Sequence, residues 1–268
     1  MSHGRFRNPV SATLAGVADF FRKQQLESRF SDRDFIDGKT CLVTGANRGL
    51  GLAIACELAS RGGRLIMACR SGIPQAGEKV KEKTGSSQVE MMHVDLSDID
   101  SIHRLCDQLE SRKIRIDILV LNAGVTPPKS QQTKQGQDLM FMVNYLSCFI
   151  LANRLLATGV IPNHTFAKTK EIGHTPRIVF ISSDSHQNAS AIDYNEFGTY
   201  KQYGVGKAIN NYSYFKLVLN TFATELSRRL RNDTDIDVTV NVICPGPVNT
   251  DIIRDAPFLL RIDRKSVV

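Results

Sequence analysis

The sequence predicts an α/β fold, a doubly wound parallel sheet with helices on both faces, and three observations support this prediction. Apolar runs of strand length alternate with helical runs from residue 41 to residue 244, which is the order expected of parallel strands joined by crossover helices. Residues 116–121 are apolar at every position but Asp117, as in a strand buried on both faces. A glycine-rich turn at residues 44–51 joins the first strand-like run to the first helical run.

The predicted elements alternate along one domain, residues 38–268, which follows an N-terminal extension over residues 1–37. Short apolar runs predict strands at residues 41–43, 65–69, 89–94, 116–121, 178–181 and 238–244. Helices are predicted between them at residues 50–60, 76–83, 97–111, 137–157 and 208–231. Ser97, with Asp100 three residues later, is expected to form a capping box that starts the third of these helices. Residues 158–176 and 185–203 interrupt the alternation, and we expect both segments to border a pocket.

Composition and charge indicate a globular domain rather than a nucleic-acid-binding or metal-binding protein. The 268 residues are 42% hydrophobic and 23% charged, which is enough for a substantial core. The net charge is +7, but the basic residues form no block and are not interleaved with aromatic residues, so nucleic acid is not expected as a partner. The six cysteines show no CxxC pair and no metal-ligand spacing, so we expect no metal and a reducing compartment.

The N-terminal extension lacks the features of a secretion signal, and no apolar run approaches the roughly 20 residues of a membrane-spanning helix. A cytoplasmic location is therefore expected. Leu14, Val17, Phe20 and Phe21 recur at roughly helical spacing, which predicts a short helix docked on the domain. The alternative is that this helix anchors the chain on a membrane surface. We favour this alternative less, because the apolar face of the helix is weak. The sequence also leaves open whether the chain forms a homo-oligomer.

A tyrosine and a lysine four residues apart indicate proton-transfer chemistry. Tyr212 and Lys216 lie within the predicted helix 208–231 and so share one face. An ammonium beside a phenol favours the phenolate, which lowers the tyrosine pKa towards the range where it can exchange a proton. Tyr203 and Lys207 have the same spacing, but two intervening glycines make that stretch a poor helix. Tyr212 is therefore the preferred acid/base.

The glycine-rich turn is suited to a dinucleotide. Gly45, Gly49 and Gly51 let backbone amides approach a phosphate group, and the helix that follows directs its positive end at that group. Arg48 lies in the turn, and Arg70 follows the second predicted strand, where an unphosphorylated ribose favours an acidic residue. Because a guanidinium pair suits a 2′-phosphate, the sequence predicts NADP(H), preferred over NAD(H). Two unconnected surface arginines are the alternative.

Two further strand ends carry candidate cofactor contacts. Asp95 and Leu96 follow the third predicted strand, and the carboxylate there either binds an adenine amino group or caps the next helix. Asn122-Ala123-Gly124 ends the fourth strand, where small residues let the backbone pass close to a cofactor.

With these motifs in place, the chain resembles the short-chain dehydrogenase/reductase family, in the subgroup that includes retinol dehydrogenase-like enzymes. The family's TGxxxGxG, NAG, VN, SS, YxxxK and PG motifs occur in family order between Thr44 and Thr250. The resemblance implies a Rossmann-type sheet and an NAD(P)-dependent enzyme acting on CH–OH donors. The relatives that act on nucleotide sugars use a different glycine spacing, TGxxGxxG, so an epimerase is not expected.

The resemblance also implies roles for individual residues. It implies a catalytic tetrad of Asn144, Ser183, Tyr212 and Lys216. Tyr212 would be the acid/base for the substrate oxygen, and Ser183 would hydrogen-bond the same oxygen. Lys216 would lower the pKa of Tyr212 and bind the nicotinamide ribose, and Asn144 would hold a water that relays protons. Ser182 and Ser185 lie beside Ser183, which the family pattern favours. The implied cofactor contacts are Gly45, Asn47, Arg48, Gly49, Leu50, Gly51, Arg70, Asp95, Leu96, Asn122, Ala123, Gly124, Tyr212, Lys216, Pro245, Gly246 and, at the carboxamide, Thr250.

The chain departs from the family pattern at two places. Phe215 stands where the family has a small residue before the lysine, so its ring either packs aside or crowds the cofactor. After Gly246 only 22 residues follow, whereas relatives continue through another helix and a seventh strand. We therefore expect the sheet to lack its last strand and the sixth strand to form an exposed edge.

The expected activity is the interconversion of a small apolar alcohol and its aldehyde or ketone with NADP(H). An apolar substrate is expected because five apolar or aromatic residues lie in or near the pocket segments: Phe141, Phe149, Ile192, Tyr194 and Phe197. The alternative is a sensor or scaffold protein that binds the cofactor but is catalytically silent. The short C-terminus and Phe215 are the two observations that suggest it.

Overall fold

The computed structural model describes residues 36–166, 174–231 and 238–246. The predicted N-terminal helix with Leu14, Val17, Phe20 and Phe21 lies outside the described residues, and so does Thr250.

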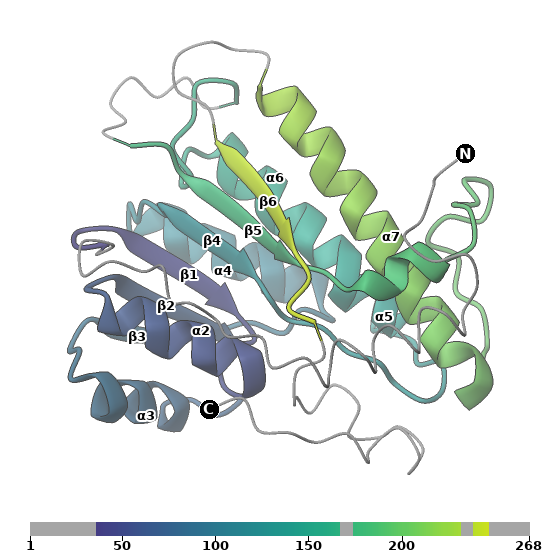
Figure 1. Ribbon diagram of the computed structural model, residues 1–268, viewed down its shortest axis with the longest axis horizontal. Coiled ribbons are helices and arrows are strands. Elements are labelled where there is room, and N and C mark those ends of the chain that lie inside the picture. Colours follow the sequence, from purple (N-terminus) through teal and green to yellow (C-terminus); the bar gives the residue numbers. More distant parts are fainter. Residues whose placement is uncertain (1–35, 167–173, 232–237, 247–268) are drawn as a thin grey trace.

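Six strands form one parallel sheet at the centre of the fold (Figure 1). They are β1 (Thr40–Thr44), β2 (Arg64–Cys69), β3 (Val89–His93), β4 (Ile118–Leu121), β5 (Arg177–Ile181) and β6 (Thr239–Ile243). Their order is β3-β2-β1-β4-β5-β6, and every neighbouring pair is parallel. The predicted doubly wound parallel sheet is confirmed.

Helices cover both faces of the sheet (Figure 1), and alternate side chains of the strands pack against them. On one face α2 (Gly49–Ser60) and α3 (Gln75–Thr84) cover a core that includes Val43 and Met67. On the other face α4 (Ile99–Ser111), α6 (Ser147–Ala157) and α7 (Val205–Leu230) cover a larger core that includes Leu42, Ile66 and Phe180. Leu42 and Val43 are adjacent yet belong to different cores, because successive strand side chains point to opposite faces.

The helix predicted at residues 137–157 is continuous but changes its helix type. It begins as α5 (Leu139–Phe141), continues as a π-helical turn, η1 (Met142–Leu146), and ends as α6. Asp138 starts it, because its carboxylate accepts hydrogen bonds from the backbone N–H of Met140 and of Phe141. The continuous stretch Leu139–Ala157 is apolar and long enough to cross a membrane, contrary to the sequence-based expectation, but 67% of it is buried in the core.

The carboxyl ends of the parallel strands meet at one edge of the sheet. The strand order reverses between β1 and β4, and ligands of open parallel sheets bind at such a reversal. The glycine-rich turn follows β1, and Asn122, Ser183 and Cys244 follow β4, β5 and β6. The fold therefore gathers most of the predicted site residues at this edge.

The last strand in the sheet order is β6, which pairs only with β5 among the described strands. Val242 and Ile243 in β6 are 41% and 46% exposed, in keeping with the expected exposed edge. An open groove of about 480 Å³ runs between β6 and the end of α7, and none of the predicted site residues lines it.

Candidate active site

The glycine-rich turn forms a cradle that has no room for side chains. Gly45 has a φ of +64°, and a Cβ on it would lie 3.0 Å from the Cα of Ala123. A Cβ on Gly51 would lie 2.3 Å from the carbonyl oxygen of Gly45 and 2.5 Å from the Asn122 Nδ2. No side chain caps the start of α2, and its first turn holds no acidic residue, so its first amides can face an anion. These residues fit a pyrophosphate.

Replacing Gly51 by alanine is expected to disrupt this cradle. The new methyl group cannot avoid backbone atoms at 2.3 Å, so we expect a stability loss of about 1–3 kcal/mol and at least about a tenfold loss of NADPH affinity. Thermal unfolding and NADPH titration by fluorescence measure both. Gly206→Ala in α7 is the matched control, because a Cβ there meets nothing within 4 Å; equal effects of the two variants would contradict the cradle.

The end of β4 is tied to the same turn. The Asn122 Nδ2 donates to the carbonyl oxygen of Thr44 at 3.0 Å, and the Thr44 hydroxyl accepts from the backbone N–H of Asn122 and of Ala123 at 3.0 and 3.1 Å. Gly124 follows directly. The structure thus brings together the two motifs predicted at the ends of β1 and β4.

The two candidate arginines come from adjacent connections. Asn47, in the glycine turn, donates from its Nδ2 to the carbonyl oxygen of Ser71 at 3.2 Å, which joins the turn to the segment after β2. Arg48 and Arg70 are both exposed on these two joined segments. They lie where the sequence places a 2′-phosphate, and their role stays a prediction.

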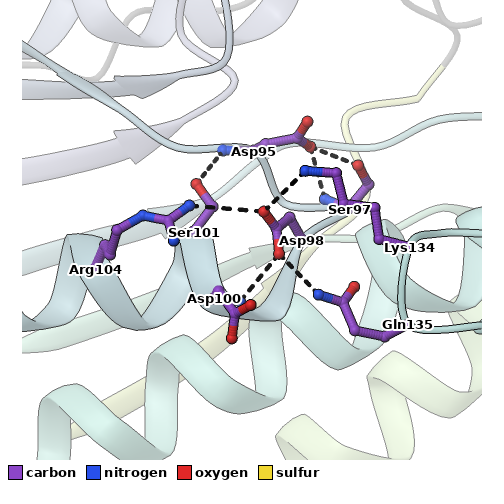
Figure 2. Close-up of polar contacts among 8 residues, drawn as sticks. All are labelled: Asp95, Ser97, Asp98, Asp100, Ser101, Arg104, Lys134 and Gln135. Atoms are coloured by element: carbon purple, nitrogen blue, oxygen red, sulfur yellow. Dashed lines mark hydrogen bonds and ion pairs between the residues drawn. The ribbon is translucent and has the colours of Figure 1, made fainter.

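Asp95 organises the connection after β3 but does not cap the next helix (Figure 2). Its Oδ1 accepts from the backbone N–H and the hydroxyl of Ser97, at 2.9 and 2.6 Å. The cap of α4 is Asp98, whose carboxylate accepts from the backbone N–H of Asp100. The predicted Ser97–Asp100 capping box is therefore wrong, because the Ser97 hydroxyl is bonded to Asp95. Leu96 is buried, and adenine binding by Asp95 stays a prediction.

Tyr212 lies on α7 and meets the end of β5. Its hydroxyl is hydrogen-bonded to the Ser183 hydroxyl, which donates to the phenol oxygen and favours its ionised form. The hydroxyls of Ser182 and Ser185 are buried and have no hydrogen-bond partner among the described residues. Of the three nearby serines, the structure therefore brings Ser183 to the tyrosine.

Lys216 lies one turn further along α7, beneath Tyr212. It is buried, its Nζ donates to the carbonyl oxygen of Ile181 at 2.7 Å, and the same nitrogen lies 5.5 Å from the centroid of the Tyr212 ring. Burial lowers the pKa of Lys216 from 10.5 to about 8. The ammonium is thus held in place by the strand that carries Ser183.

The expected lowering of the Tyr212 pKa is not found. Burial raises the pKa of Tyr212 to about 12, the nearby Cys244 thiol adds to this rise, and the Ser183 hydrogen bond opposes it. Removing water from a phenolate costs more here than the hydrogen bond returns. Tyr212 is therefore a protonated phenol at neutral pH.

Asn144 lies in the π-helical turn η1 and is buried. Its Oδ1 accepts from the backbone N–H of Val125 at 2.8 Å, and its Nδ2 donates to the carbonyl oxygen of Val125 at 2.9 Å. The side-chain amide thus anchors the connection that follows β4. The role of Asn144 in holding a water stays a prediction.

Cys244 is a site residue that the sequence reasoning missed. It ends β6 directly before Pro245 and Gly246, and its Sγ accepts from the backbone N–H of Asp184 at 3.2 Å. Its thiol influences the pKa of both Tyr212 and Lys216. Its position immediately before the PG motif is the signal that could have identified it.

Phe215 packs aside within an aromatic cluster. Its ring centroid lies 5.7 Å from that of Phe141, which in turn lies 5.5 Å from Phe197. Phe149 packs on Phe222 at 5.0 Å. Tyr194, expected near the pocket, is 77% exposed, so its ring lines no enclosed pocket among the described residues.

Comparison with known proteins agrees with this arrangement. A family model described as short chain dehydrogenase matches residues 39–201, which end before α7. The chain is 34% identical to human retinol dehydrogenase 13 over 254 residues, covering 93% of this chain and 72% of that protein. It is 31% identical to human polyprenol dehydrogenase over 229 residues, covering 85% of this chain and 66% of that protein. A solved structure of an uncharacterized protein from Mycobacterium paratuberculosis matches with a TM-score of 0.63 and 29% identity, over 82% of this chain and 73% of that one.

Proposed function

Because the chain belongs to the short-chain dehydrogenase/reductase family, in its retinol dehydrogenase-like subgroup, we propose that it interconverts an apolar alcohol and its aldehyde or ketone with NADP(H). Membership of this family makes it an NAD(P)-dependent oxidoreductase acting on CH–OH donors. The observation that carries the proposal is the grouping of Ser183, Tyr212 and Lys216 at the edge of the sheet where the glycine cradle also lies.

The side chains suit carbonyl reduction. The nicotinamide would supply the hydride when bound. Tyr212, protonated at neutral pH with a pKa of about 12, would donate its proton to the substrate oxygen. Ser183 would donate a hydrogen bond to the same oxygen and stabilise its developing charge. Lys216, with a pKa of about 8, would be mostly charged at neutral pH and would stabilise the phenolate that forms.

An apolar substrate is supported by the names of the relatives and by the rings near the site. One relative is named for retinol and another for polyprenol, and both of these alcohols are largely hydrocarbon. In this chain Phe141 and Phe197 form part of the aromatic cluster next to the helix of Tyr212.

The first test of the function is thermal unfolding of the 268-residue chain with NADPH and with NADH. A ligand at 100 times its Kd stabilises by about 2.7 kcal/mol, which raises the Tm by roughly 5–10 °C at this size. We expect this shift with NADPH and a clearly smaller one with NADH, followed by NADPH oxidation in a screen of apolar aldehydes and ketones. Binding without turnover of any carbonyl would support the silent sensor instead.

The proposed NADP(H) preference depends on Arg48 and Arg70. We expect Arg48→Ala with Arg70→Ala to weaken NADPH at least about tenfold, because the charged hydrogen bonds to a 2′-phosphate are lost, and to leave NADH binding unchanged. Titration of both cofactors measures this difference. Arg64→Ala is the matched control, since Arg64 is an exposed arginine at the opposite end of β2. Equal loss of NADPH and NADH affinity would contradict the assignment.

A further inference from the structure

Asp98 joins two connections of the site that are distant in the sequence (Figure 2). Its Oδ1 accepts from the backbone N–H of Asp100 at 3.2 Å and from the Nε2 of Gln135 at 2.8 Å. Arg104 and Lys134 lie 3.6 and 3.7 Å from its Oδ2. Only 12% of the Asp98 side chain is exposed. The Gln135 hydrogen bond is the main reason why the pKa of Asp98 is lowered, so this bond favours the carboxylate.

On one side, Asp98 is continuous with the candidate adenine contact. The backbone N–H of Asp98 donates to the carbonyl oxygen of Asp95 at 3.1 Å. Asp95 is fixed further by Ser97 and by the Ser101 hydroxyl, which accepts from the backbone N–H of Asp95 at 2.9 Å. A nucleotide held by Asp95 would therefore act directly on the position of Asp98.

On the other side, Gln135 belongs to a hairpin that leads into the helix with Asn144. The backbone N–H of Leu139 donates to the carbonyl oxygen of Gln131 at 2.8 Å, and Gln132 and Asp138 form an antiparallel bridge. Asp138 caps α5, and α5 continues without a break into η1 and Asn144. The hairpin thus has little freedom to move without moving the start of this helix.

The same connection also touches the segment before α7. The backbone N–H of Ser130 donates to the carbonyl oxygen of Tyr203 at 3.0 Å, and the Ser130 hydroxyl accepts from the backbone N–H of Tyr203 and from the hydroxyl of Tyr200. Residues 125–138 are therefore held at Val125 by Asn144, at Ser130 by the segment before α7, and at Gln135 by Asp98.

We propose that Asp98 is a positioning residue that, through Gln135, couples the adenine end of the cofactor site to the π-helical turn with Asn144. The inference rests on the proposed function, because it takes NADPH as the ligand that contacts residues 95–98. Gln135 is an exposed side chain on a loop, and its hydrogen bond to a buried carboxylate is charge-assisted, which makes it a shorter and stronger link between the two connections than the Lys134 ion pair at 3.7 Å.

The test measures NADPH affinity together with amide hydrogen exchange over residues 125–144, with and without NADPH. In the parent chain we expect NADPH to increase protection of this segment. Gln135→Ala should lower the affinity for NADPH about fivefold to tenfold and remove the added protection. It should shift the Tm little, because the lost hydrogen bond is on the surface. Gln132→Ala is the matched control: its side chain lies in the same hairpin, bonds only the carbonyl oxygen of Gly136 among the described residues, and should leave both readouts unchanged.

A charge exchange makes the test independent of side-chain truncation. Gln135→Glu places a carboxylate against Asp98 and should reduce NADPH affinity at least as much as Gln135→Ala. Asp98→Asn combined with Gln135→Glu again sets an amide against a carboxylate, and it should restore most of the affinity and the NADPH-induced protection.

Three results would overturn the inference. The first is a Gln135→Ala variant that behaves like Gln132→Ala in both readouts, and the second is a variant whose Tm falls while affinity and protection are unchanged. The third is that Asp98→Asn combined with Gln135→Glu restores neither the NADPH affinity nor the NADPH-induced protection. If the parent chain itself binds no NADPH, the proposed function fails and the inference with it, and this outcome is read from the parent alone.

Discussion

Tyr212→Phe is expected to reduce carbonyl reduction by about 10³-fold while leaving NADPH affinity within about twofold of the parent. The phenol is hydrogen-bonded to the Ser183 side chain and can donate a proton to a substrate oxygen. The phenyl ring keeps the packing of Tyr212 above Lys216. Single-turnover oxidation of enzyme-bound NADPH, followed at the nicotinamide absorbance, measures the chemical step apart from binding.

Tyr203→Phe is the control for this prediction, because Tyr203 is the other tyrosine with a lysine four residues on. Its hydroxyl is buried without a hydrogen-bond partner among the described residues, and α7 begins only at Val205, so Tyr203 and Lys207 do not share a helix face. We expect Tyr203→Phe to keep full turnover. The assignment of Tyr212 would be wrong if the two variants exchanged these behaviours.

Lys216→Met is expected to abolish turnover and, unlike most active-site changes, to stabilise the chain. Lys216 is buried, and its pKa falls from 10.5 to about 8, so at pH 7 the folded state carries an unfavourable buried charge. By linkage this pKa shift lowers the free energy of unfolding by roughly 3 kcal/mol. The variant avoids this cost but loses the hydrogen bond to Ile181, which offsets about 1 kcal/mol of the gain. We expect Lys216→Met to be about 1–2 kcal/mol more stable than the parent at pH 7, measured by urea unfolding without cofactor.

The pH dependence checks the origin of this difference. Between pH 8 and 10.5 the unfolded chain binds a proton at Lys216 that the folded chain has released, so the stability of the parent rises with pH through this window. The advantage of Lys216→Met should therefore shrink from pH 8 upwards. The comparison stops near pH 10, because the pKa of Tyr212 is 10.0 in the unfolded chain and about 12 in the folded chain. Above pH 10 the unfolded chain therefore loses this proton first, which lowers the stability of the folded state. A difference that stays constant from pH 7 to pH 10 would exclude the buried charge as its cause.

The fold was predictable because its signals are local and repeated. Residues 118–121 are apolar without interruption, and a short apolar run that lies between helical segments fits few arrangements other than a central parallel strand. Tyr212 and Lys216 were predictable as a pair for the same reason, since a spacing of four on a long helix fixes a shared face.

What could not be predicted depends on contacts between distant segments. The pKa of Tyr212 depends on burial and on Cys244, which lies 32 residues away in the sequence. Asp95 determines which residue caps α4. Its carboxylate accepts the hydrogen bond of the Ser97 hydroxyl, so Asp98 rather than Ser97 caps the helix. The side-chain amide of Asn144 is bonded to the backbone of Val125, and no spacing in the sequence indicates that contact.

The π-helical turn η1 also limits how this chain can be compared with others by sequence. A π-turn is an α-helix with one residue inserted, and one residue corresponds to about 100° of rotation. A helical wheel drawn through Leu139–Ala157 as a single α-helix therefore misplaces Asn144 relative to one half of the helix. An alignment that closes this one-residue insertion with a gap would move Asn144 to a different face, and the residue that braces the site would then look like an ordinary core position.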